Sequence, residues 1–122
     1  MKILAVMSDL FFSVKINDAA KRLGMSAEFV KDATLALQKI KTKPPMAIFD
    51  LNCASAAPLD LIRALKADPE TQAIPTIGFV SHVQTDLRRE AEASGCDVVV
   101  ARSAFAQNLD EILRRFAPAP TA

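Results

Sequence analysis

The sequence of 122 residues contains no tryptophan, no tyrosine and one histidine, and its 15 basic and 14 acidic residues leave a net charge of +1. Aromatic platforms for stacking bases and an excess of positive charge are both missing, which argues against nucleic acid as a partner. The apolar runs are far shorter than the ~20 residues of a membrane-spanning helix. The amino-terminal run is not followed by a cleavage site, so we expect a cytoplasmic protein that does not bind membranes.

Cysteine and glycine are also scarce. Cys53 and Cys96 have no metal-binding or redox spacing. Because Cys53 follows one predicted strand and Cys96 precedes another, we expect them at opposite ends of a sheet, where no disulfide can form. None of the three glycines follows the first predicted strand, so the phosphate-binding loop of a nucleotide or flavin enzyme is missing. We therefore expect no enzyme, and a small nucleotide- or flavin-binding protein remains only an alternative.

The sequence does contain several short apolar runs that indicate buried strands. Residues 46–49 end at Asp50 and follow two prolines, which exclude a helix at that point. A continuous apolar run of this length is typical of a strand buried on both faces of a parallel sheet. The other strands are predicted at residues 2–7, 27–30, 74–80 and 98–101.

Amphipathic segments separate these runs and predict helices. The predicted helices cover residues 10–23, 33–40, 58–67, 87–94 and 103–116. The expected caps are Ser8 or Asp9, Asp32, Thr85 or Asp86, and Ser103. In the first helix we expect a buried stripe made by Leu10, Phe11, Val14, Ala20 and Leu23. Strict alternation of strands and helices predicts one α/β domain, residues 1–117, with a parallel sheet covered on both faces and a flexible tail at 118–122.

Polar side chains gather where the predicted strands end. Asp9, Asp50, Asn52 and Arg102 all lie at such ends, as does the pair Ser81-His82. The carboxyl ends of parallel strands share one edge of a sheet, and open α/β sheets bind their ligands there. We expect the functional site at this edge, with His82 as a loop residue because no nucleophile is predicted beside it.

The chain resembles the receiver domains of response regulators (CheY-like) over residues 2–116. The matching segments are residues 2–6, 47–52, 74–75 and 95–100, followed by Arg102 and Phe105. The resemblance implies a flavodoxin-like doubly wound fold with strand order 2-1-3-4-5 and five helices. It also implies that Asp50 accepts a phosphoryl group from a histidine kinase and that the backbone carbonyl of Asn52 helps to hold Mg²⁺.

Around Asp50 the sequence departs from that family. The two adjacent acids that hold Mg²⁺ are replaced by Met7 and Ser8, and Asp9 comes one residue later. Only Asp9, Asp50 and Asn52 are left as candidate metal ligands, so any Mg²⁺ would bind weakly. Arg102 replaces the family's lysine, and we expect it to pair with Asp50 in place of the metal.

Two further positions of the family pattern also differ. Ser103 replaces the usual proline, and either Val80 or Ser81 occupies the place of the family's hydroxyl residue. These departures predict an atypical receiver that acts through protein–protein interaction, with weak or absent phosphorylation of Asp50. The expected partner is a histidine kinase or an output protein, or a second copy through the face of the fourth helix, fifth strand and fifth helix. The alternative is a working phosphoacceptor in which Asp9 binds Mg²⁺ beside Asp50.

Overall fold

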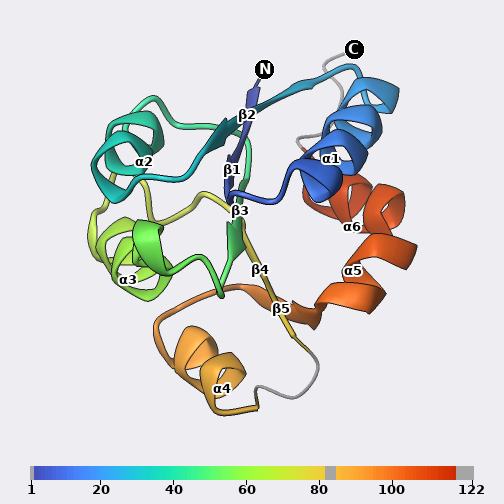
Figure 1. Ribbon diagram of the computed structural model, residues 1–122. Coiled ribbons are helices and arrows are strands. Elements are labelled where there is room, and N and C mark those ends of the chain that lie inside the picture. Colours follow the sequence, from blue (N-terminus) through green and yellow to red (C-terminus); the bar gives the residue numbers. More distant parts are fainter. Residues whose placement is uncertain (1, 82–84, 118–122) are drawn as a thin grey trace.

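The structure, a computed structural model, describes residues 2–81 and 85–117 (Figure 1). Its centre is a five-stranded parallel sheet with the order β2-β1-β3-β4-β5. The strands are β1 (Lys2–Val6), β2 (Ser26–Val30), β3 (Ala47–Asp50), β4 (Thr76–Val80) and β5 (Val98–Ala101). The predicted fold class and strand order are confirmed.

Helices cover both faces of the sheet (Figure 1). One layer contains α1 (Leu10–Arg22), α5 (Arg102–Gln107) and α6 (Leu109–Phe116). The other contains α2 (Ala33–Ile40), α3 (Pro58–Ala67) and α4 (Thr85–Ala93). A short 3-10 helix, η1 (Ala54–Ala56), follows β3, and Pro58 opens α3 as predicted.

Apolar side chains form a separate core on each face of the sheet. All four residues of β3 are buried. Phe49 packs in the core below α2 and α3, whereas Ile48 packs in the core below α1, α5 and α6. Strand β3 is therefore covered on both sides, as its continuous apolar run predicts. Both cysteines are buried free thiols.

The expected buried stripe of the first helix is wrong at its first three positions, whereas Ala20 is buried and Leu23 is partly buried, as predicted. Leu10, Phe11 and Val14 are 81%, 89% and 60% exposed. The buried side chains of α1 are instead Phe12, Ile16, Ala19 and Ala20. Their spacing of four, three and one residues is equally helical, and it places Phe12 and Ile16 in the core between α1 and the sheet. The start of the helix fixes this rotation, because Asp9 Oδ1 accepts a hydrogen bond from the Phe12 N–H (3.1 Å).

The predicted last helix is two helices. The backbone of Asn108 leaves the helical region (φ −114°, ψ 21°), and its Nδ2 donates to the carbonyl of Ala104 (3.0 Å). The residue before α5 is Ala101, which makes no side-chain cap, so Ser103 is not the cap that the sequence predicts. Thr85 and Asp86 likewise lie inside α4 rather than before it. The predicted cap Asp32 is confirmed, since it accepts from Leu35 N (2.9 Å).

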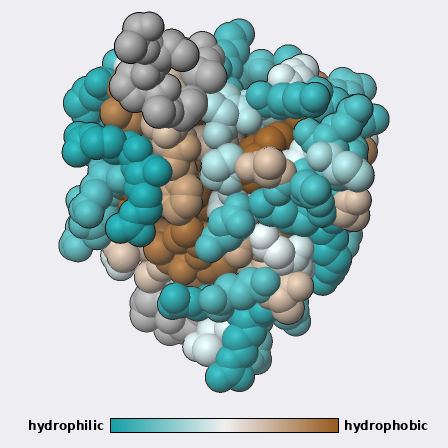
Figure 2. All heavy atoms as spheres, turned by 180° about the vertical axis from the view of Figure 1, so that it is seen from behind, coloured by the Kyte–Doolittle hydropathy of each residue, from teal (hydrophilic) through white to brown (hydrophobic). Residues whose placement is uncertain are grey.

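Figure 2 shows the molecule from behind, with hydrophilic side chains over most of this face and apolar ones gathered in a strip near its middle. Within residues 2–81 and 85–117, every helix is too short or too polar to cross a membrane.

The loop between β3 and α3 contains a strained residue. Ala57 has a left-handed backbone (φ 46°, ψ 59°), which favours glycine. We expect Ala57→Gly to raise the free energy of unfolding by about 0.5–1 kcal/mol, because relief of strain at Cβ exceeds the extra chain entropy. The matched change Ala64→Gly, on the exposed face of α3, should lower it by about 1 kcal/mol. Urea unfolding followed by circular dichroism measures both, and a loss of stability in Ala57→Gly would contradict the left-handed loop.

Candidate functional site

The strand ends bring the predicted site residues to one edge of the sheet. Asp9 follows β1, Asp50 ends β3, and Asn52 lies in the next turn. Ser81 follows β4, and Arg102 follows β5 as the first residue of α5. All five strands are parallel, so these residues lie at the same edge. His82 is outside the described residues.

Asp50 is a buried carboxylate. It is only 6% exposed, and its Oδ1 accepts a hydrogen bond from the Asn52 N–H (3.0 Å). Burial raises the pKa of the Asp50 carboxyl, and the hydrogen bond from Asn52 offsets only part of that rise. Within the described part of the chain, no lysine or arginine forms an ion pair with Asp50. Ionisation of the Asp50 carboxyl in the folded protein therefore costs free energy.

The predicted pair between Arg102 and Asp50 is wrong, because Arg102 pairs with Asp9. Its Nη2 contacts Asp9 Oδ2, while the other oxygen of Asp9 caps α1. The guanidinium lies over the rings of Phe12 and Phe79, 5.1 and 5.8 Å from their centroids. A planar cation can stack on aromatic faces and donate to a carboxylate at the same time. This arrangement ties the β1–α1 turn to the start of α5.

Three phenylalanine rings form a cluster, and two of them, Phe12 and Phe79, lie below Arg102. Phe12, Phe79 and Phe105 stack nearly in parallel, with centroids 4.9 to 5.5 Å apart. They come from α1, β4 and α5, so their sequence spacing gives no sign of the contact. Phe79 is the register partner of Asp50 across β3 and β4. The aromatic cluster thus lies directly beside the carboxylate, and sequence reasoning missed it.

The residues in the places of the metal-binding acids do not fit a divalent cation. Met7 is 3% exposed and packs in the core below α1, and Ser8 is exposed. A hard cation needs oxygen ligands, and a buried thioether offers none. Asp9, the nearest carboxylate in the sequence, already holds Arg102 and the helix amide. Among the described residues there is no group of three His, Cys, Asp or Glu that could hold a metal ion.

Val80 and Ser81, the two candidates for the family's hydroxyl position, have different surroundings at the end of β4. Val80 is the last strand residue, pairs in register with Ala101, and is buried in the core below α2 and α3. Ser81 is the first residue after the strand, and its N–H donates to Asn52 Oδ1 (3.3 Å). Asn52 therefore connects the turns after β3 and β4.

A patch of exposed apolar side chains lies next to this edge. The patch, which we call the α1 patch, consists of Leu10, Phe11 and Val14 in the first two turns of α1. A depression of about 240 Å³ lies beside it, between the β1–α1 turn and the end of β2. Exposed apolar side chains that are grouped together commonly mark contact surfaces. The sequence signal was available, since these residues fall opposite the longer stripe that begins at Phe12.

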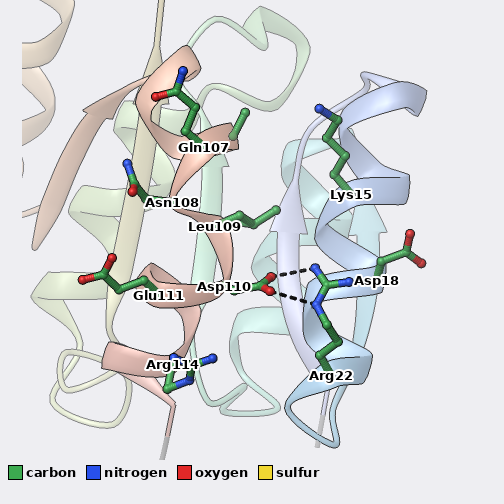
Figure 3. Close-up of a pocket in the computed structure, with 10 residues that line it drawn as sticks. Lys15, Asp18, Arg22, Gln107, Asn108, Leu109, Asp110, Glu111 and Arg114 are labelled. Carbon is green, nitrogen blue, oxygen red and sulfur yellow. Dashed lines mark hydrogen bonds and ion pairs between the residues drawn. The ribbon is translucent and has the colours of Figure 1, made fainter.

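A second and larger depression, of about 470 Å³, lies between α1 and the last two helices (Figure 3). Arg22 extends from α1 and makes two hydrogen bonds to the carboxylate of Asp110 on α6 (2.6 and 2.9 Å). These bonds lower the pKa of the Asp110 carboxyl and raise that of Arg22. The other lining residues carry both signs of charge, for example Lys15 and Glu111. Polar and charged side chains thus connect α1 to α6 in this depression, and none of the predicted site residues line it.

Comparison with known proteins gives a match in structure alone. No protein-family model matches the sequence, and no curated protein matches it significantly. A response regulator from Hahella chejuensis superposes with a TM-score of 0.85 at 19% identity, over 99% of this chain and 98% of that one. The phosphorylated cyanobacterial phytochrome response regulator RcpA gives a TM-score of 0.84 at 16% identity, over 98% and 96% of the two chains.

A receiver domain that holds a metal is similar as well. The receiver domain of a sensor histidine kinase from Pseudomonas aeruginosa, with magnesium coordinated in its active-site cleft, gives a TM-score of 0.80 at 18% identity. The match covers 94% of this chain and 95% of that one. By its architecture, this chain has the receiver fold of the response regulators.

Proposed function

We propose that this chain is an atypical receiver in two-component-type signalling, which acts through protein–protein contacts with weak or absent phosphorylation of Asp50. The observation that carries the proposal is the pairing of Asp9 with Arg102 beside a buried Met7. Phosphoryl transfer depends on positioning and on neutralising charge, usually with a metal ion. Here the carboxylate that could help to hold a metal is engaged by a side chain of the chain itself.

Two surfaces support an interaction role. The first is the face of α4, β5 and the last two helices, α5 and α6, where a histidine kinase, an output protein or a second copy would bind. Exposed charges of both signs lie on α4 and α6, such as Arg88, Glu92 and Glu111, and such mixed charges suit specific contacts. The second is the α1 patch, whose apolar side chains a protein partner would cover.

The alternatives receive less support. A working phosphoacceptor would need Asp9 to turn towards Asp50, whereas both oxygens of Asp9 have other partners. No observation favours a nucleotide- or flavin-binding protein, because the loop after β1 has no glycine and begins with Met7 and Ser8.

The test is phosphorylation by acetyl phosphate with and without Mg²⁺, followed by mass spectrometry of the intact protein. We expect almost no added phosphate, and no difference between the wild-type protein and Asp50→Asn. A second receiver with both acids present serves as the positive control. Stoichiometric, Mg²⁺-dependent acylphosphate that disappears in Asp50→Asn would refute the proposal.

A further inference from the structure

We infer that Arg102 is a built-in counter-ion, which supplies to this edge the positive charge that a divalent cation supplies in magnesium-binding receivers. The inference rests on the proposed function and concerns the regulation of the same site. It makes the conformation of the edge independent of divalent cations.

The first argument is the use of the Asp9 oxygens. Oδ1 accepts the Phe12 N–H and fixes the start of α1 (3.1 Å), and Oδ2 binds the Arg102 guanidinium. A cation that approaches Asp9 therefore competes with Arg102 and with the helix amide for the same two oxygens. Since Arg102 carries a full positive charge, it also repels an incoming cation.

The second argument is the pair of rings below Arg102. One turn of α1 provides both the carboxylate of Asp9 and the ring of Phe12, and β4 adds Phe79. The guanidinium lies over these rings while its Nη2 contacts Asp9. A lysine ammonium is a compact, strongly hydrated charge that cannot make both contacts in this way. Arginine at this position is thus matched to its surroundings in shape as well as in charge.

The third argument is the nearby Asp50. Its carboxylate is buried, with 6% of the residue exposed. Phe79, which supports Arg102, is the register partner of Asp50. The fixed cation therefore lies over a residue of the strand next to the one that ends at Asp50, without forming an ion pair with Asp50.

The experiment is a titration with MgCl₂ followed by two-dimensional NMR of backbone amides, in the wild-type protein and in Arg102→Met. In the wild type, we expect the amides of residues 8–12 and 50–52 to shift no more than those around the exposed Asp60. In Arg102→Met, which keeps an apolar side chain over the rings, these amides should shift saturably. The apparent Kd for Mg²⁺ should be at least about tenfold lower than in the wild type, because a positive charge beside two acidic residues is removed.

The matched control is Arg63→Met, which removes an exposed arginine that also pairs with an aspartate, Asp60 (3.0 Å). We expect this variant to respond to Mg²⁺ at residues 8–12 and 50–52 as the wild type does. If Arg102→Met does not fold, Arg102→Gln answers the same question, because it removes the charge and keeps a hydrogen-bond donor for Asp9. The same fall in Kd relative to the wild type is expected. A wild type whose edge binds Mg²⁺ as tightly as the Arg102 variants would overturn the inference.

The two proposals fail separately. Acylphosphate on Asp50 of a wild type whose edge amides ignore Mg²⁺ would remove the proposed function and leave Arg102 as the counter-ion. Saturable Mg²⁺ shifts at the edge of the wild type, without acylphosphate, would remove the counter-ion and leave the proposed function.

Discussion

Phe12→Ala is expected to lower the free energy of unfolding by about 3–5 kcal/mol, the usual cost of removing a buried phenylalanine ring. Phe12 is 6% exposed, stacks on Phe79 and Phe105, and lies below the Arg102 guanidinium. The variant therefore loses apolar burial, two ring contacts and part of the support of Arg102. Urea unfolding followed by far-UV circular dichroism measures the change, since the chain has no tryptophan to report by fluorescence.

The neighbouring residue provides the control. Phe11 is 89% exposed, so Phe11→Ala should change the free energy of unfolding by less than about 0.5 kcal/mol. Both changes place the same residue in the first turns of α1, which makes the difference in helix propensity nearly equal. Equal losses in the two variants would show that α1 is rotated differently from the structure.

Asp50→Asn is expected to stabilise the protein at neutral pH by about 1 kcal/mol, because it removes a buried charge and keeps an oxygen for the Asn52 N–H. The pKa of Asp50 is raised in the folded state by burial. The folded state therefore binds the proton more tightly than the unfolded state. The free-energy cost of an ionised Asp50 is absent at pH values below the pKa that Asp50 has in the unfolded chain. It grows as the pH rises to the higher pKa that Asp50 has in the folded protein.

The stabilisation by Asp50→Asn should accordingly shrink as the pH is lowered through that window. Unfolding curves of the two proteins at matched pH values measure it, and other titrating groups cancel in the difference. Asp97 is one such group: burial acts to raise its pKa, but hydrogen bonds from Lys66 and Thr76 lower it on balance. The control is Asp18→Asn, an exposed carboxylate on α1, with an expected change below about 0.5 kcal/mol. A gain from Asp50→Asn that does not depend on pH would contradict the raised pKa.

The sequence alone determined the order of strands and helices and the position of Asp50. Continuous apolar runs such as residues 46–49, between segments of helical pattern, are typical of strands in a parallel sheet, and parallel strands end at a common edge. The absence of the acid pair was also visible, because Met7 and Ser8 follow directly from the count along the first strand. These properties depend on local pattern and on chain order.

The tertiary structure alone decided the rotation of α1, the break at Asn108 and the partner of Arg102. Two apolar stripes of helical spacing compete in α1, and only packing against the sheet selects the one with Phe12. The family pattern predicted that Arg102 pairs with Asp50. In the structure the guanidinium instead binds Asp9 and lies over the rings of Phe12 and Phe79. Ion pairs and ring contacts between distant segments depend on side-chain geometry to within an ångström or so, and the spacing of residues along a chain does not contain that information.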